Sequence, residues 1–449
     1  METFTRLRGT FDGGRTRDRG WRTGQLRAIE RMLVECEDEF AAALAEDLGR
    51  TPFESVLLDL APTKAEVRHA LRNLRGWMRP HRVRAPLGTR PGRAWYEHEP
   101  LGVVLIIGPW NYPVHLVVAP LIAAVSAGNC AVIKPSEFAP ASSAALAKAI
   151  PGYLDPGAFA VVEGDADVTR ALLDQAPDHC FFTGGPAVGK EIMAAAARHL
   201  TPVTLELGGK CPAIVTESAR VGVAARRIAF GKLLNSGQTC ISPDYVLVDR
   251  RVRDEFVEEL VAAVRTFSEG GDQRIVNPRH AARLAGLLVD AGGRTVLGGT
   301  VDAEGARAQP TVIVDPEPGA ALLREEIFGP LLPVVTVGSL EEAVGHVRRG
   351  TRPLATYLFT EKRDDERRVL REIVTGGTVV NHVMMHHAVS DLPFGGVGTS
   401  GTGRYHGRWG FEALSNPKAV LRKPSRPDLS FMYPPYSPSA QRLMGRLLR

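Results

Sequence analysis

The sequence predicts an α/β fold built from two doubly wound domains, and three observations support this prediction. From Pro100 to His199, short apolar segments alternate with helical segments of roughly ten residues. A second alternating set follows Gly208-Gly209. The chain of 449 residues is also too long for a single core. Because strands alternating with helices form crossovers between parallel neighbours, each set indicates a parallel sheet.

The chain opens with a helical region, residues 22–78. Apolar residues recur there every three or four positions, as at Leu26, Ile29 and Leu33. Residues 80–98 are rich in Pro, Arg and Gly and end in an alternating apolar and polar run. We therefore expect a linker that leads into a hairpin strand.

The first alternating set supplies the first sheet. Its expected strands are residues 103–107, 130–133, 158–162, 180–183 and 203–207, and its expected helices are 113–127, 141–150, 168–175 and 187–199. Sheets of this kind bind ligands at the carboxyl ends of their strands.

The second set supplies the second sheet, and we place the domain boundary near Gly208-Gly209. Its expected strands are residues 245–248, 332–337, 355–359 and 378–380, and its expected helices are 223–234, 253–267, 340–348 and 365–374. Residues 392–403 are Gly-rich and predict a loop at the domain interface. Residues 418–422 predict an edge strand, and residues 437–449 form a basic amphipathic run.

The composition is that of an ordinary soluble globular protein, with 44% hydrophobic and 23% charged residues. The net charge of +5 is compatible with an anionic ligand or with an Arg-rich solvated surface. We expect no nucleic-acid partner, because no basic face with interleaved aromatic residues is found.

Cysteine usage and apolar runs indicate a cytoplasmic location. The five cysteines are scattered and match neither a disulfide framework nor a zinc pattern. No signal peptide is recognised. The longest apolar run, residues 114–125, contains Pro120 and is too short to span a bilayer, so we expect no stable membrane insertion.

Cys240 is the candidate nucleophile. It lies in a run of small and polar residues, 235–241, between a helical pattern and a strand-like run. Loops at the ends of elements bring reactive groups to a cleft, so this position suits a reactive thiol better than a core thiol.

Asn111 and Glu206 are candidate partners of the thiol. Asn111 follows the first buried strand and precedes a helix, so it is either a helix cap or a hydrogen-bond donor to a cleft. Glu206 ends a strand before two glycines, which suits a general base whose pKa is raised by burial or a salt-bridge partner.

Two further stretches suit a dinucleotide. Lys134 and Glu137 follow a strand, where they would hold ribose hydroxyls or form a surface ion pair. Residues 182–191 form a glycine-rich turn from strand to helix, which offers backbone N–H groups to a phosphate. This turn matches most of a P-loop, but Glu191 replaces the magnesium-binding hydroxyl, which argues against a nucleotide triphosphatase.

We expect no metal site. His382 and His386 are spaced like ligands on a helix, but no Glu lies between them as in zinc peptidases and the preceding run is strand-like.

Taken together, these stretches resemble the aldehyde dehydrogenase superfamily, most closely its class 3 branch, which includes fatty aldehyde dehydrogenases. The resemblance covers nearly the whole chain. Its motifs are Pro109-Trp110-Asn111, Lys134-Pro135-Ser136-Glu137, Leu205-Glu206-Leu207-Gly208-Gly209-Lys210, Gly237-Gln238-Thr239-Cys240, Glu325-Glu326-Ile327-Phe328-Gly329-Pro330 and Leu392-Pro393-Phe394-Gly395-Gly396.

The resemblance implies a mechanism. Cys240 would add to the aldehyde carbonyl, Asn111 and the Cys240 N–H would hold the oxyanion, and Glu206 would activate the water that hydrolyses the thioester. Tyr112 would line the substrate pocket. The expected substrates are medium- or long-chain aliphatic aldehydes, or aromatic ones.

The resemblance also implies an NAD or NADP site. The residues expected to contact the cofactor are Trp110, Lys134, Glu137, Gly184, Gly185, Val188, Leu207, Glu326 and Phe328. We favour NAD because Glu137 would repel a 2′-phosphate.

The implied organisation is an aldehyde dehydrogenase-like fold with two Rossmann-like domains. Residues 1–80 and 99–208 would bind the cofactor and residues 209–395 would form the catalytic domain. Residues 81–98 and 411–449 would contribute oligomerisation elements and a tail, and the resemblance implies a homodimer formed through them. We expect the tail helix near the substrate entrance or against a partner subunit.

Two alternatives remain at this stage. An acylating relative would pass the thioester to coenzyme A, although such relatives commonly lack the glutamate found here at position 206. A structural or binding protein would keep the fold without the chemistry, and the intact Cys240 argues against that.

Overall fold

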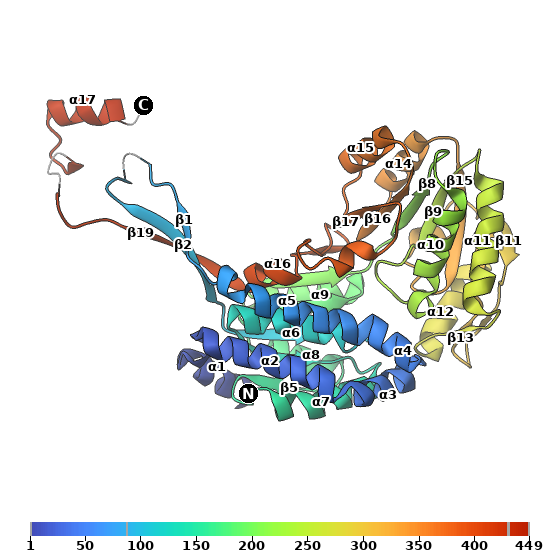
Figure 1. Ribbon diagram of the computed structural model, residues 1–449, viewed down its shortest axis with the longest axis horizontal. Coiled ribbons are helices and arrows are strands. Elements are labelled where there is room, and N and C mark those ends of the chain that lie inside the picture. The colour runs from blue at the N-terminus through green and yellow to red at the C-terminus, as the bar shows by residue number, and fades with distance from the viewer. Residues whose placement is uncertain (1, 87–88, 429–431, 448–449) are drawn as a thin grey trace.

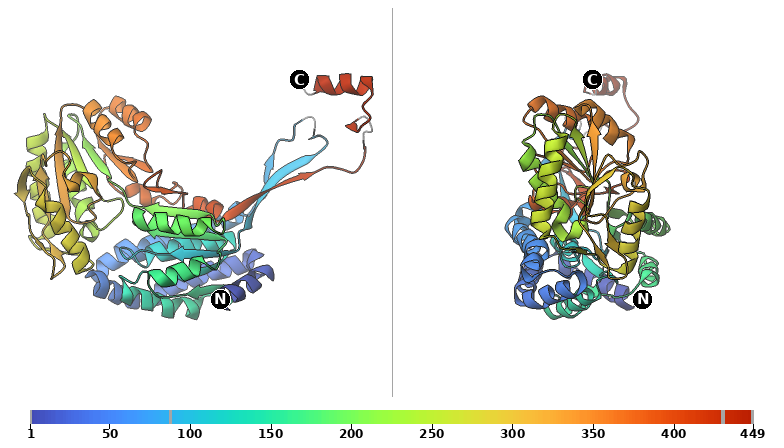
Figure 2. Two further views of the ribbon diagram at one scale, coloured as in Figure 1. Left: turned by 180° about the vertical axis from the view of Figure 1, so that it is seen from behind. Right: turned by 90° about the vertical axis from the view of Figure 1, so that its right-hand side faces the viewer.

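The computed structural model describes residues 2–86, 89–428 and 432–447. Over these residues the chain forms two α/β bodies and a projecting arm (Figure 1). Figure 2 shows the same arrangement from behind and from one end. The mixed α/β prediction is confirmed.

The N-terminal helices cover the first body. They are α1 (Glu2–Asp12), α2 (Arg19–Glu35), α3 (Glu37–Leu48), α4 (Pro52–Ser55) and α5 (Ala61–Trp77). Asp18 caps α2 by accepting a hydrogen bond from the Trp21 N–H, and α3 ends at Gly49, which has a φ of 70°. Helix α5 packs against both α2 and α6 (His115–Ala127), so this region forms a helical layer over the first sheet.

The first sheet has the strand order β18-β7-β6-β3-β4-β5. Its strands are β3 (Val103–Ile107), β4 (Cys130–Lys134), β5 (Phe159–Val161), β6 (His179–Gly184), β7 (Val203–Leu207) and β18 (Gly401–Thr402). The connecting helices are α6, α7 (Pro140–Tyr153), α8 (Ala166–Leu173) and α9 (Pro186–Ala197). Strands β3 to β7 are parallel, so their carboxyl ends lie along one edge.

The second sheet has the order β11-β14-β15-β9-β8-β16-β17 and is parallel except for β11. Its strands are β8 (Pro212–Val215), β9 (Tyr245–Asp249), β11 (Arg294–Leu297), β14 (Thr311–Val314), β15 (Leu331–Val337), β16 (Ala355–Phe359) and β17 (Gly377–Val380). Its helices are α10 (Val221–Leu233), α11 (Arg253–Ser268), α12 (Pro278–Val289), α13 (Ala321–Arg324), α14 (Leu340–Arg349) and α15 (Arg363–Glu372). Helix α16 (Gly407–Ala413) packs instead against α5 and α6 of the first body. The change of sheet falls between β7 and β8, around Gly208 and Gly209.

Sequence analysis missed several elements of this body. Strand β8, helix α12, strands β11 and β14, and the small β10-β13-β12 sheet were not predicted; the last comprises β10 (Gln273–Arg274), β12 (Val301–Asp302) and β13 (Arg307–Ala308). These strands have two to four residues, and Gly292, Gly293, Gly298 and Gly299 interrupt the region. Such segments are too short to show a strand period.

The arm is an antiparallel sheet of β1 (His81–Val83), β2 (Arg93–Pro100) and β19 (Ser415–Arg422). It includes the predicted hairpin strand and edge strand. Beyond it, α17 (Pro438–Leu447) lies away from both bodies (Figure 1). The predicted place of the tail near this subunit's own substrate entrance is therefore wrong, and a place against a partner subunit stays a prediction. Residues 429–431, 448 and 449 of the predicted tail, and 87 and 88 of the predicted linker, lie outside the described residues.

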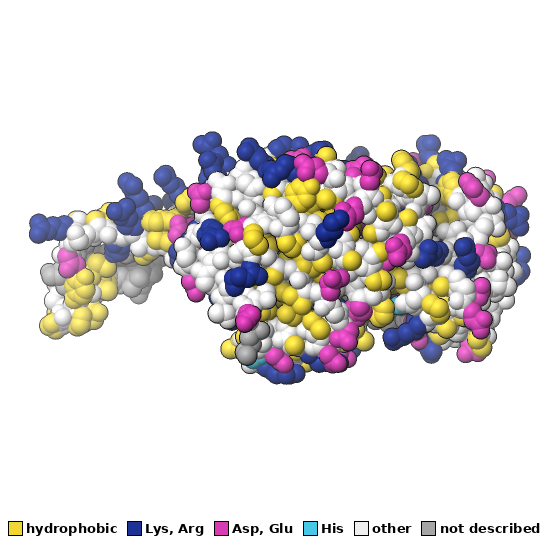
Figure 3. Space-filling model, turned by 90° about the horizontal axis from the view of Figure 1, so that it is seen from below, with side chains coloured by type: hydrophobic (Ala, Val, Ile, Leu, Met, Phe, Trp, Pro, Cys, Tyr) yellow, Lys and Arg dark blue, Asp and Glu magenta, His cyan; other side chains and the backbone are white. Residues whose placement is uncertain are grey.

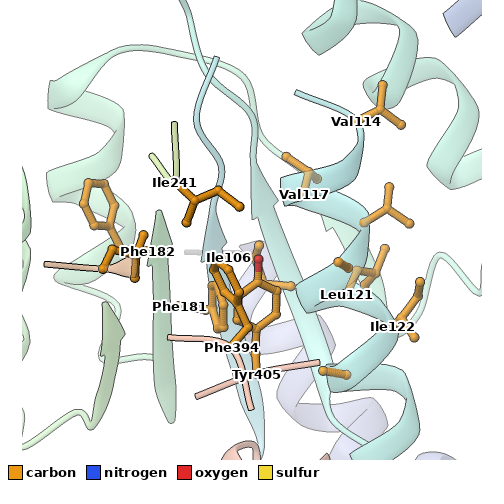
Figure 4. Close-up of a cluster of buried hydrophobic side chains, with 14 of the residues drawn as sticks. Ile106, Val114, Val117, Leu121, Ile122, Phe181, Phe182, Ile241, Phe394 and Tyr405 are labelled. Atoms are coloured by element: carbon orange, nitrogen blue, oxygen red, sulfur yellow. The ribbon is translucent and has the colours of Figure 1, made fainter. Parts of the chain in front are cut away.

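An apolar cluster joins the two bodies (Figure 4). Ile106 and Phe181 come from the first sheet, while Ile241 follows the Cys240 loop and Phe394 lies in the Gly-rich loop. Because these side chains share one core, the loop that carries Cys240 is held above the first sheet.

Candidate active site

The loop that carries Cys240 makes a tight left-handed turn at the end of α10. Asn235, Ser236 and Gly237 have φ values of 53°, 57° and 72°. A Cβ at Gly237 would lie 2.3 Å from the carbonyl oxygen of Gly329, so only glycine fits there. Left-handed backbone at a residue such as Ser236 costs about 1–3 kcal/mol and persists only where the surroundings fix it.

Gln238 supplies part of that fixation. Its side-chain amide donates to the Asn235 carbonyl at 3.2 Å and accepts from the Val276 N–H at 2.9 Å. The side chain is buried. Gln238 belongs to the motif that ends at Cys240 but had no predicted role. Its side chain ties the nucleophile's loop to the neighbouring β10 region.

Asn111 lies at the end of β3 and faces this loop. Its Nδ2 donates to the Gln238 carbonyl at 3.0 Å. Helix α6 begins later, at His115, with Val114 at its N-cap, so Asn111 does not act as its cap. A primary amide has two N–H donors. One therefore orients the side chain, and the other is available to a ligand.

Arg50 holds the backbone of Asn111 in place. Its guanidinium donates to the Asn111 carbonyl at 2.6 Å and to Asn235 Oδ1 at 3.0 Å, and it forms a buried ion pair with Asp59. Asp59 in turn accepts from the N–H groups of Val114 and His115, at 3.1 and 2.7 Å. Sequence reasoning missed Arg50 and Asp59 because they come from the N-terminal helical region, far from the motifs in sequence.

Glu206 lies on β7, buried, with neither carboxylate oxygen hydrogen-bonded among the described residues. Burial raises the pKa of Glu206 well above its usual range, while the charge of Arg404 acts in the opposite direction. A Cβ at Gly395 would lie 2.9 Å from Oε1, so the glycine loop packs directly against this carboxyl group. An unpaired buried carboxyl group with a raised pKa suits a general base.

Cys240 carries a protonated thiol in this state. Burial raises its pKa to about 12, and the nearby Glu326 and Glu206 act in the same direction, whereas the N–H groups of Cys240 and Ile241 favour the thiolate. The predicted activation of the thiol therefore needs a cation or a base brought to the site.

Tyr112 supports the same loop. Its hydroxyl lies 2.6 Å from Thr239 Oγ1, and the Arg50 guanidinium lies 4.7 Å from its ring centre. Tyr112 is buried, and its predicted contact with substrate stays a prediction.

The predicted cofactor residues from the first body meet at one edge of the first sheet. Lys134 ends β4 and donates to Glu137 at 2.6 Å; the lysine side chain is buried and the glutamate is partly exposed. Gly184 ends β6 and Gly185 is the N-cap of α9, with Val188 exposed in the first turn. Leu207 ends β7, and its N–H donates to the Ser400 carbonyl at 3.2 Å.

Glu326 and Phe328 reach the same region from the second body. A Cβ at Gly208 would lie 1.9 Å from a carboxylate oxygen of Glu326, so this side chain lies against the end of β7. Burial, helped by Asp244, raises the pKa of Glu326 to about 8. The Phe328 ring is 5.4 Å from the Trp110 ring, which also packs 5.1 Å from His280. His280 was not among the predicted residues.

These residues fit a nicotinamide dinucleotide. The first turn of α9 presents backbone N–H groups to an anion, and Lys134 with Glu137 offers a donor and an acceptor for ribose hydroxyls. Glu326 Oε1 is buried and has no hydrogen-bond partner among the described residues, so it has capacity to accept from a ligand hydroxyl.

Two parallel α/β sheets thus meet at a partly buried thiol, an amide donor and a carboxyl group that has no hydrogen-bond partner among the described residues, an arrangement typical of enzymes that act through a cysteine nucleophile. Residues 10–420 match the sequence profile described as the aldehyde dehydrogenase family. The chain belongs to the aldehyde dehydrogenase family, in its class 3 branch, and is an NAD(P)-dependent enzyme that oxidises aldehydes.

Relatives in sequence and structure agree with this assignment. Aldehyde dehydrogenase family 3 member B1 of Rattus norvegicus is 44% identical over 445 residues, which cover 97% of this chain and 94% of that protein. The substrate-bound structure of Staphylococcus aureus AldH has a TM-score of 0.96 at 37% identity and covers 100% of this chain and 99% of that one. Indole-3-acetaldehyde dehydrogenase in complex with NAD⁺ has a TM-score of 0.86 at 25% identity, covering 94% and 88%.

Proposed function

We propose that this enzyme oxidises medium- or long-chain aliphatic aldehydes, or aromatic ones, to free carboxylic acids, with NAD as the preferred cofactor. The observation that carries the hydrolytic outcome is Glu206, which is buried, unpaired among the described residues, and close enough to Cys240 to raise the pKa of its thiol. A carboxylate there can activate water in the same cavity as a thioester on Cys240.

We propose that the reaction proceeds in three chemical steps. Cys240 Sγ, once deprotonated, bonds to the carbonyl carbon, and the oxygen becomes an oxyanion that accepts from the free N–H of Asn111 and from the Cys240 N–H. NAD, held by the residues around Lys134, Glu137 and Glu326, would supply the hydride acceptor for this carbon. Glu206 then takes a proton from water, whose oxygen attacks the thioester carbon and releases the acid and the thiol.

NAD is preferred over NADP because of Glu137. Its carboxylate is held by Lys134 at 2.6 Å, beside the position proposed for the adenosine ribose. A carboxylate there accepts from a 2′-hydroxyl and repels a 2′-phosphate. The complex of the indole-3-acetaldehyde enzyme with NAD⁺ supports this choice of cofactor.

The test is NADH formation by the purified enzyme without coenzyme A, with NAD or NADP and a series of aldehydes from short aliphatic to long-chain and aromatic. We expect steady turnover, greater with NAD, and a KM that falls as the apolar chain lengthens. Turnover that requires coenzyme A would support the acylating alternative instead.

We also propose a homodimer in the cytoplasm. The arm exposes the apolar residue Leu421, and the segment between the arm and α17 exposes Met432, Tyr433 and Tyr436. Figure 3 shows basic side chains along the arm and hydrophobic ones at its end. A second copy would cover this apolar surface. Among residues 2–86, 89–428 and 432–447, none of the helices combines the length and the apolar character that a bilayer span requires. Light scattering on the full chain, and on a chain ending at Arg422, tests the dimer.

A further inference from the structure

Three imidazoles that the proposed mechanism does not use meet inside the protein. His115 is the first residue of α6, His387 lies in the short turn Met385–Ala388, and His406 precedes α16. One ring nitrogen from each lies within 4.8 Å of the other two. His387 and His115 are 272 residues apart in sequence, so no spacing could have revealed the group, and neither His382 nor His386 belongs to it.

The hydrogen bonds of Thr63 determine which nitrogen of His115 is bare. The Thr63 hydroxyl donates its only proton to the Asp59 carbonyl oxygen. Its oxygen lies 2.8 Å from His115 Nδ1, so it must accept from an Nδ1–H there. Nε2 of neutral His115 then carries a lone pair, which is directed at Nε2 of His387, 3.2 Å away. An imidazole held through one N–H with its other nitrogen bare is the form that binds metals.

Two further nitrogens of the cluster lack partners among the described residues. Nδ1 of His387 and Nε2 of His406 are buried and make no hydrogen bond to any described residue. His115 and His406 are 3% and 4% exposed, so water is largely excluded from them.

The geometry matches a tetrahedral ion. With metal–nitrogen bonds of about 2.0–2.1 Å, neighbouring ligand nitrogens are about 3.3 Å apart. The His115 and His387 nitrogens already have this separation at 3.2 Å. A nitrogen of His406 lies within the 4.8 Å limit of the cluster, so it needs to approach by at most about 1.5 Å. The His406 ring stacks on Phe394 at 5.3 Å, which holds it facing His387, 4.7 Å from it between ring centres.

We propose that His115, His387 and His406 bind one divalent transition-metal ion of the Zn²⁺ class, each through one ring nitrogen. Three imidazoles favour zinc, cobalt, nickel and copper over magnesium and calcium, which prefer oxygen ligands. Thr63 is a positioning residue, because it holds His115 in the ligating tautomer. This site is separate from the thiol chemistry of Cys240.

Calorimetric titration of the Cys240→Ala enzyme with Zn²⁺ tests the proposal, since that background removes the catalytic thiol as a competing ligand. We expect one Zn²⁺ per chain and no heat of binding with Mg²⁺. Loss of a hydrogen-bond partner that orients a ligating histidine typically weakens metal binding about 10- to 100-fold. Thr63→Val removes such a partner of His115, so we expect it to weaken Zn²⁺ binding by this factor. His387→Asn removes a ligand and is expected to weaken binding at least about 100-fold.

His386→Asn is the matched control, because His386 packs on the same Phe394 at 5.7 Å but is outside the cluster, and it should bind Zn²⁺ like its parent. Thermal unfolding with and without Zn²⁺ shows that each variant is folded and gives a second readout, since a bound ion raises the melting temperature. Absence of Zn²⁺ binding by the folded Cys240→Ala enzyme, or undiminished binding by folded His387→Asn, would overturn the proposal.

Discussion

Replacing Glu206 by Gln separates the two halves of the reaction. The substitution preserves size and removes the ability to take a proton from water. General-base catalysis typically contributes about 10²- to 10⁴-fold, so we expect steady-state kcat to fall by that factor, or about 2.7–5.5 kcal/mol. Addition of Cys240 to the aldehyde and transfer of the hydride do not need this base. A rapid-quench experiment should therefore give about one NADH per active site before turnover stalls.

The same substitution changes how stability depends on pH. Burial raises the pKa of Glu206 above 4.5, so the folded enzyme keeps a proton that the unfolded chain loses as the pH rises through that value. Ionisation at Glu206 therefore lowers the free energy of unfolding of the wild-type protein as the pH rises from about 4.5 to the folded-state pKa, with a limiting slope of about 1.4 kcal/mol per pH unit. The Glu206→Gln variant has no such ionisation and should not show this loss. The melting temperature of the variant should exceed that of the wild type by a margin that grows with pH.

Glu304→Gln, at an exposed position, is the control and should change neither kcat nor the pH dependence of the melting temperature. A Glu206→Gln enzyme that turns over at the wild-type rate would refute the role of this carboxyl group. A difference in melting temperature that stays constant from pH 5 to pH 9 would refute its raised pKa.

Three further substitutions test the oxyanion donor and the residues that hold the Cys240 loop in place. Asn111→Ala removes an oxyanion donor and should lower kcat by about 10²- to 10³-fold with little change in NAD binding, measured by steady-state kinetics and cofactor fluorescence. Arg50→Met leaves Asp59 buried without its cation, so chemical denaturation should show a loss of about 3–5 kcal/mol, and adding Asp59→Asn should restore part of it. Gly237→Ala places a Cβ against the Gly329 carbonyl, so the variant should lose activity. In the control Gly286→Ala, on α12, the new Cβ meets no atom within 4 Å, so this variant should remain active. An active Gly237→Ala enzyme would contradict the packing of the Cys240 loop.

The sequence predicted the parts of the fold that have a strong periodicity. The alternating apolar segments of the first body became β3 to β7 close to their predicted bounds, and β7 and β16 match theirs residue for residue. Helix α12 could have been predicted from its sequence, because an N-cap residue, Asn277, precedes Pro278 and is followed by apolar residues at helical spacing. Of these, Ala281 and Leu284 form part of its buried face. The short strands between 294 and 314 gave no such signal, because segments of two to four residues are too short to show an alternating period.

For the site, motifs identified residues that contact ligands but not those that hold them. Cys240, Asn111 and Glu206 stand at the ends of elements, where residue type alone suggests chemistry. Arg50 resembles any surface arginine in sequence, and its role emerges only because the fold brings it to the Asn111 carbonyl. The raised pKa of Cys240 likewise depends on burial and on Glu326, which lies on a segment remote in sequence.

The pairing of β18 with β7 affects how the protein is made. Strand β7 is complete once residue 207 has been synthesised, yet its outer edge pairs with Ser400, Gly401 and Thr402, which are made much later. A ribosome that has produced the whole first body therefore still displays an open strand edge, with unpaired N–H and C=O groups ready to associate with other chains. The nascent N-terminal half depends on the final part of the sequence for protection, so a chain truncated before residue 401 is expected to aggregate even though every other strand of the first sheet is present.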